Sequence, residues 1–136
     1  MRLSLSLLLT AGLWSLTAIG RADISRDIVE RGRKATVYIE IDDGSGSAFC
    51  IAPNGYFITN AHVVAGSSKV RVVLNSGDAA ARVLLARVVR TNTDLGLALI
   101  KIEAEGLTAL PLGATKDLYE TLPVTTFGFP FGSDLT

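Results

Sequence analysis

Between Lys34 and Ile102 the chain alternates short runs of aliphatic, β-branched and aromatic residues with clusters of glycine, proline, asparagine and aspartate. Residues of the first kind favour β-strands, and those of the second kind favour tight turns. The pattern predicts strands at 35–41, 47–51, 56–59, 69–74, 79–90 and 95–102. Six short strands at this spacing are typical of an antiparallel barrel, so we expect an all-β fold.

Two segments need a separate decision between helix and strand. Residues 79–86 are rich in alanine and leucine and have the propensity of a helix, but the regular spacing of the turns around them favours a strand. Before the first strand, Ile24, Ile28 and Val29 recur at helical spacing, and Gly32 is a suitable stop. We therefore predict one short helix at 23–33.

The N-terminus carries an uncharged, leucine-rich run from Leu3 to Gly20 behind Met1-Arg2. Small residues at Ala18, Gly20 and Ala22 provide two candidate cleavage sites before a polar segment. We predict a signal peptide at 1–22 and an exported protein, periplasmic or extracellular. The run is near the lower length limit for crossing a bilayer, so an uncleaved N-terminal membrane anchor is the alternative.

Composition excludes several classes of function. Lys plus Arg and Asp plus Glu both number 13, so no overall basic field exists to attract nucleic acid. Cys50 is the only cysteine, which rules out an intrachain disulfide, and its apolar neighbours predict a buried side chain. His62 is the only histidine, so the usual zinc ligand sets cannot be assembled, and we predict no metal and no cofactor. Proton transfer near neutral pH is the role that suits a lone imidazole.

The segments Gly44–Ile51 and Pro53–Val64, which end in Thr-Asn-Ala-His-Val-Val, resemble the first hairpin and the histidine turn of trypsin-like serine peptidases of the HtrA/Deg type. Three later segments agree with this resemblance in order and spacing, namely 69–77, 97–102 and 128–132. The resemblance implies the first antiparallel barrel of a chymotrypsin/trypsin-like double β-barrel at 34–121. It also implies the start of a second, incomplete barrel at 122–136. The apolar run at 122–127, which Gly128 and Pro130 end, predicts a strand, and the looser segment at 103–120 predicts an interdomain connection.

The same resemblance implies that His62 is the catalytic general base. In the family an aspartate stands immediately before the Leu-Ala-Leu-Ile run, but Gly96 occupies that position here. Asp94, two residues upstream, is the candidate for the orienting carboxylate. In an extended strand it would lie about 6.5–7 Å from the expected position, unless Gly96 allows a bulge.

The family's nucleophile lies in a Gly-Asn-Ser-Gly-Gly sequence that this chain, which ends at Thr136, does not contain. The serines at 45, 47, 67, 68, 76 and 133 lack that context, and we interpret them as turn or surface residues. The resemblance implies a serine endopeptidase acting on polypeptide substrates in exported protein hydrolysis or quality control, with this chain inactive alone. The alternative is a non-catalytic pseudo-protease or binding module, and oligomeric state is not predicted.

Overall fold

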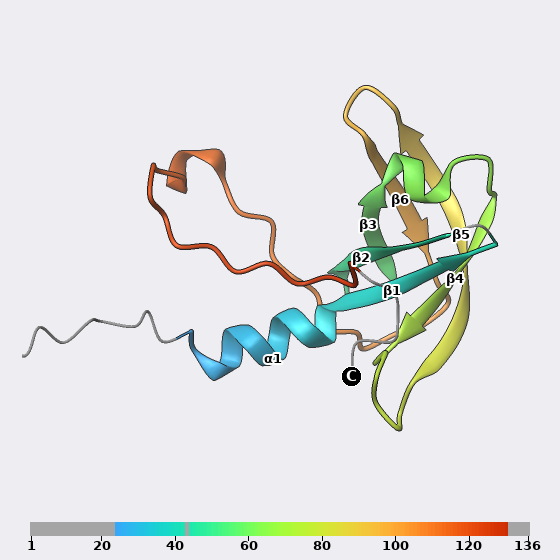
Figure 1. Cartoon of the computed structure of the whole chain (residues 1–136), viewed down its shortest axis with the longest axis horizontal. Coiled ribbons are helices and arrows are strands. Elements are labelled where there is room, and N and C mark those ends of the chain that lie inside the picture. The colour runs from blue at the N-terminus through green and yellow to red at the C-terminus, as the bar shows by residue number, and fades with distance from the viewer. Residues whose placement is uncertain (1–23, 43, 131–136) are drawn as a thin grey trace, which may run out of the picture.

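The computed structural model describes residues 24–42 and 44–130, and it confirms the all-β prediction (Figure 1). One helix, α1 (Arg26–Ala35), precedes six strands. The strands are β1 (Thr36–Ile41), β2 (Gly44–Ala52), β3 (Tyr56–Asn60), β4 (Lys69–Leu74), β5 (Arg82–Asn92) and β6 (Leu97–Lys101). The predicted strand is confirmed from Arg82, where β5 begins, whereas residues 79–81 precede it in the β4–β5 turn and do not belong to the strand.

Helix α1 begins and ends later than the predicted range of 23–33. Asp27 lies in its first turn and Arg33 and Lys34 in its last, which suits the helix dipole. Gly32 does not stop the helix. It is buried beneath the Phe127 ring, which lies 2.3 Å from where a Cβ on Gly32 would be, so this glycine provides room for a long-range contact.

The six strands form a closed antiparallel barrel in the order β1-β2-β3-β6-β5-β4. Pairing of β1 with β4, with Ile39 opposite Val72, closes the sheet on itself. A closed barrel has no free strand edge along which another strand could add.

Alternate residues of every strand face the barrel interior. The fully buried large side chains are Phe57, Ile39, Ile100, Ile102, Val37, Val72 and Cys50. Burial raises the pKa of the Cys50 thiol, and the Sγ donates a hydrogen bond to the Ala52 carbonyl, as expected for a structural cysteine.

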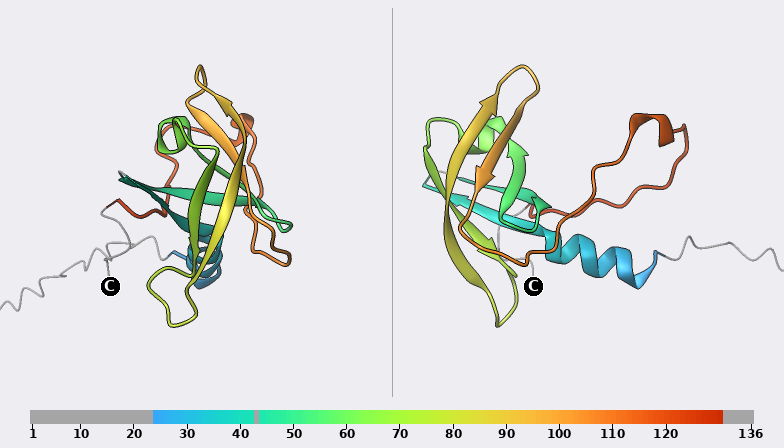
Figure 2. Two further views of the ribbon diagram at one scale, coloured as in Figure 1. Left: turned by 90° about the vertical axis from the view of Figure 1, so that its right-hand side faces the viewer. Right: turned by 180° about the vertical axis from the view of Figure 1, so that it is seen from behind.

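The chain after β6 first follows the barrel and then leaves it. The Leu107 amide donates to the Pro53 carbonyl and the Leu110 amide to the Cys50 carbonyl, so residues 102–110 cover the end of the barrel where β3 begins. Beyond Leu110 the segment projects away from the barrel, with a short 3-10 helix, η2 (Thr115–Asp117), near its tip (Figure 2). This is the region predicted to be an interdomain connection.

The prediction of a strand at 122–127 is wrong for this chain, because these residues form no regular structure. A strand needs a hydrogen-bonded neighbour, and the closed barrel offers no free edge. The segment docks instead through aromatic rings. Phe127 covers Gly32, and the Phe129 ring meets the Tyr38 ring edge-on with centroids 5.7 Å apart.

Within the described ranges, no helix is long and apolar enough to cross a membrane. The predicted signal peptide at 1–22 lies outside those ranges.

Gly55 provides a test of barrel packing. Its φ is +95°, and a Cβ there would lie 2.3 Å from the Ile102 carbonyl oxygen, whereas Gly77 has a similar φ of +82° but open space around it. We expect Gly55→Ala to lower the free energy of unfolding by about 3 kcal/mol, through backbone strain plus overlap. Gly77→Ala should cost only the strain, about 1 kcal/mol. Urea unfolding measures both, and equal losses would show that the contact with Ile102 does not matter.

Candidate active site

His62 lies in the 3-10 helix η1 (Ala61–Val64), directly after β3. Val63 and Val64 are 6% and 2% exposed and belong to the barrel core, while His62 is exposed. Burying two consecutive valines at the end of the barrel leaves the preceding imidazole on the outside. The hydrophobic pair therefore places the one histidine at the end of the barrel, on its outside.

Gly46 of β2 makes room for this turn. A Cβ on Gly46 would lie 2.7 Å from both methyl carbons of Val63, closer than a side chain can approach. Thr59, buried at the end of β3, donates a hydrogen bond from Oγ1 to the Ser47 carbonyl at 2.8 Å. Gly46 thus lets η1 pack against β2, and Thr59 joins β3 to β2 just before the histidine turn.

The turn between β5 and β6 carries Asp94. Asn92 pairs with Leu97 at the end of the hairpin, and residues 93–96 form the loop. The Gly96 amide donates to the Thr93 carbonyl, and the Leu95 amide donates to Asn92 Oδ1 at 3.0 Å. Gly96 has a φ of +66°, a left-handed conformation that glycine adopts without strain.

This geometry differs from the bulge that the sequence suggested at Gly96. The irregularity in the hairpin lies in β5 between Val88 and Arg90, and Gly96 closes the loop. Asp94 therefore projects from a turn and not from an extended strand, because β6 begins at Leu97 and not at Leu95. The distance of about 6.5–7 Å expected for Asp94 assumed an extended strand, so it does not apply to this loop.

One hydrogen bond joins the two loops. The Ala61 amide donates to the Gly96 carbonyl at 2.8 Å, next to the pairing of Asn60 with Leu97. The residue before His62 is thus fixed to the residue that occupies the family's aspartate position. Asp94 is exposed, and in the described part of the chain no hydrogen bond or ion pair connects its carboxylate with His62. Its orienting role stays a prediction.

Ser47 is more than the turn or surface residue that we predicted. It lies within β2, and its Oγ accepts a hydrogen bond from the Phe129 amide at 2.7 Å. Its carbonyl accepts the bond from Thr59, so Ser47 connects the strand before His62 with the docked segment at 127–129. The repeated Gly-Ser pattern at 44–47 was the only sequence sign of this role. Ser133 lies outside the described residues.

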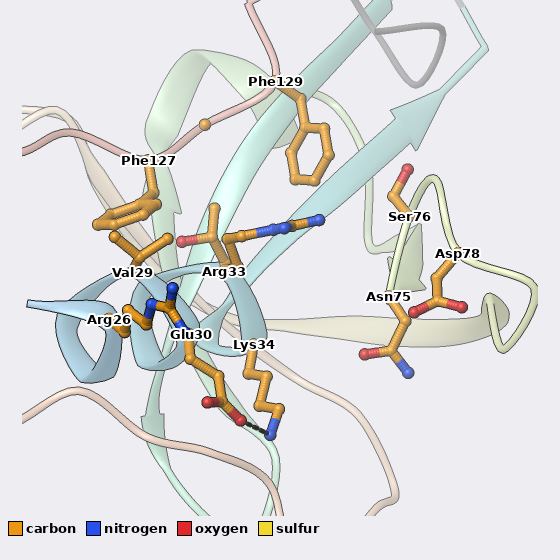
Figure 3. A pocket seen from close by; sticks show the side chains of 12 residues that line it. Arg26, Val29, Glu30, Arg33, Lys34, Asn75, Ser76, Asp78, Phe127 and Phe129 are labelled. Carbon is orange, nitrogen blue, oxygen red and sulfur yellow. Dashed lines mark hydrogen bonds and ion pairs between the residues drawn. The ribbon is translucent and has the colours of Figure 1, made fainter. Parts of the chain in front are cut away.

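The described residues contain no group of three or more His, Cys, Asp or Glu side chains able to hold a metal ion. A cavity of about 680 Å³ lies between α1, the β4–β5 turn and segment 127–129 (Figure 3). Its walls include Val29, Arg33, Asp78 and Phe127, but neither His62 nor Asp94. This cavity is therefore separate from the histidine turn.

Comparison with known proteins gives the family. Residues 46–136 match the trypsin-like peptidase domain family. A probable periplasmic serine endoprotease, DegP-like, from Halomonas elongata is 42% identical over 89 residues, which are 65% of this chain and 18% of that protein. The mitochondrial serine protease HTRA2 of Bos taurus is 37% identical over 117 residues, which are 77% of this chain and 25% of that protein.

Two solved structures of the same type are also similar to this chain. An HtrA-type protease with a tripeptide matches with a TM-score of 0.58 and 30% identity, over 67% of this chain and 30% of that chain. Deg5 matches with a TM-score of 0.59 and 29% identity, over 68% of this chain and 49% of that chain. The chain belongs to the trypsin-like peptidase family, and within it to the HtrA/Deg type. It spans 18% and 25% of the lengths of the two curated relatives given above.

The contact between Gly46 and Val63 predicts a specific energetic coupling. Gly46→Ala overpacks the site and should destabilise the barrel by about 1–3 kcal/mol. In a Val63→Ala background the added methyl group has room, so the same change should cost much less. A double-mutant cycle by urea unfolding measures this coupling, and strictly additive effects would contradict the contact.

Proposed function

We propose that this chain provides the histidine half of the active site of a serine endopeptidase, with His62 as general base and Asp94 as the orienting carboxylate. The observation that carries the proposal is the hydrogen bond from the Ala61 amide to the Gly96 carbonyl. It holds the histidine turn beside the loop of the β5–β6 hairpin. The relatives of this chain are serine proteases. Exposure of His62 leaves its imidazole accessible to a substrate and a nucleophile.

In the proposed reaction His62 transfers a proton and Asp94 orients the His62 ring. The His62 imidazole takes the proton of a serine hydroxyl as the oxygen attacks the peptide carbonyl, and it then gives the proton to the leaving amine. A carboxylate on the opposite ring nitrogen fixes the tautomer that can accept this proton. The Thr93–Gly96 loop has one carboxylate, Asp94, and we assign this role to it.

We assign neither the nucleophilic serine nor the oxyanion-hole donors to residues of this chain. A Gly-Asn-Ser-Gly-Gly sequence does not occur in the 136 residues, so we expect the purified chain neither to hydrolyse casein nor to react with a fluorophosphonate probe. Polypeptides are the proposed substrates, in line with the protease relatives and with the structural relative that includes a tripeptide.

The second candidate is a pseudo-protease that binds polypeptides without cleaving them. Gly96 favours it, because the family's aspartate position carries no side chain and the loop leaves Asp94 exposed. Hydrolysis and serine labelling by the complete product, tested below, distinguish the two candidates.

We further propose that the protein is exported and acts in the periplasm. Support comes from the signal-like segment at 1–22 and from the relatives described as periplasmic. Mass spectrometry of the mature protein should find an N-terminus near Arg21 or Asp23, and retention of Met1 would contradict cleavage.

The catalytic assignment is tested in the complete translated product of the gene, assayed on a peptide substrate. His62→Ala should lower kcat by about a millionfold, since it removes the general base. Asp94→Asn should lower kcat by about ten-thousandfold if the carboxylate fixes the tautomer.

Asp78→Asn is the matched control, because Asp78 is an exposed carboxylate in the β4–β5 turn. It should leave kcat unchanged. An Asp94→Asn variant as active as the Asp78→Asn variant would remove Asp94 from the site. A complete product with no hydrolysis and no serine labelling would favour the pseudo-protease.

A further inference from the structure

The barrel wall formed by β4, β5 and β6 has an unbalanced charge. These strands carry six basic residues and no acidic one, although the chain as a whole is neutral. The basic residues are Lys69, Arg71, Arg82, Arg87, Arg90 and Lys101. In the left view of Figure 2 this wall faces the viewer, and α1 and the projecting segment lie behind it.

Strand register places like charges side by side on the outside of this wall. Lys69 is directly opposite Arg87, and their neighbours in the next row, Val70 and Ala86, are buried, so both basic side chains point outward. Like charges directly opposite each other destabilise a sheet. The pair is therefore unfavourable in the isolated barrel, and a negatively charged partner would relieve it.

Among the described residues, carboxylates neutralise only the borders of the wall. On one side Arg71 pairs with Glu40 at 3.1 Å and Asp42 at 3.8 Å. On the other side the Lys101 ammonium turns aside, donates to the Ile102 carbonyl and pairs with Glu103. Between these borders Lys69, Arg87 and Arg90 are exposed and form no ion pair with any described residue.

Aliphatic side chains are exposed among these cations. Val83 is 59% exposed, Leu85 58% and Val89 39%. Val83 and Leu85 share the outward face of β5 with Arg87, and Val89 is the extra residue of the β5 bulge next to Arg90. We call the six residues Lys69, Val83, Leu85, Arg87, Val89 and Arg90 the β5 face.

The shape of the β5 face limits what can bind it. A peptide cannot add to it as a strand, because the closed barrel has no free edge. The cavity at its margin, beside Lys69 and Leu85, has only about 70 Å³, too little for a helix or an extended segment. A broad, convex surface of cations and aliphatic side chains suits a partner that spreads negative charge over an apolar layer.

We propose that the β5 face binds the surface of an anionic phospholipid membrane. Lys69, Arg87 and Arg90 lie against the headgroup phosphates, and Val83, Leu85 and Val89 reach the boundary with the acyl chains. This inference does not depend on the catalytic assignment, since the β5 face includes neither His62 nor Asp94.

The test is sedimentation of the full 136-residue chain with vesicles of phosphatidylcholine, with and without an equal part of phosphatidylglycerol. The chain should bind the anionic vesicles more tightly, and added salt should weaken this binding. Arg87→Glu with Arg90→Glu should weaken it by about thirtyfold or more, because each lost cation near the surface counts about a kcal/mol before repulsion is added. Arg87→Gln with Arg90→Gln removes the charges with less risk to the fold and should weaken binding by a smaller factor.

Arg26→Glu with Arg33→Glu is the control, because it makes the same change in net charge at exposed positions of α1. This variant should keep most of the binding. Any contribution of the apolar segment at 1–22 is common to all variants and cancels in the comparison. Circular dichroism verifies that each variant is folded.

Three results would overturn the proposal. The first is equal binding to neutral and anionic vesicles. The second is an equal loss of binding in the α1 control variant, which would indicate net charge alone. The third is binding to polyglutamate without binding to anionic vesicles, which would identify an acidic polypeptide as the partner of the β5 face.

Discussion

Burial of Val63 and Val64 at the end of a closed barrel is the constraint on which the candidate site depends. These side chains can leave water only if η1 folds against the barrel, and this fixes the backbone of His62. Closure of the sheet by β1 and β4 provides the rigid rim for that contact. The backbone of His62 is thus positioned by hydrophobic packing, while its exposed imidazole makes no side-chain hydrogen bond within the described residues.

The second element of the site, the Thr93–Gly96 loop, depends on strand register. Asn92, Leu97 and Asn60 lie in one row across β5, β6 and β3, so the loop of the hairpin and the histidine turn emerge at the same rim. The bond from the Ala61 amide to the Gly96 carbonyl then connects them. The same row of paired residues would fix the backbone of a catalytic aspartate in this loop.

Much of this arrangement could be predicted from the sequence because it is local. Runs of β-branched residues and turn clusters gave the strands, and the residues around His62 gave the family. The features that were mispredicted depend on distant contacts. Gly32 is a point of packing for Phe127, and segment 122–127 is irregular because the barrel leaves no edge free. Likewise, nothing near Gly96 in the sequence indicates whether it forms a bulge or closes a loop, because the pairing of β5 with β6 decides that.

Amide hydrogen exchange of Ala61 shows whether the histidine turn is held against the β5–β6 loop through Ala61 and Gly96. An amide whose hydrogen bond forms part of the barrel exchanges only when the barrel opens. We expect the Ala61 amide to exchange as slowly as that of Val72 in the core, and far more slowly than that of Asp94 in the exposed loop. An Ala61 amide that exchanges as fast as the Asp94 amide would contradict this expectation.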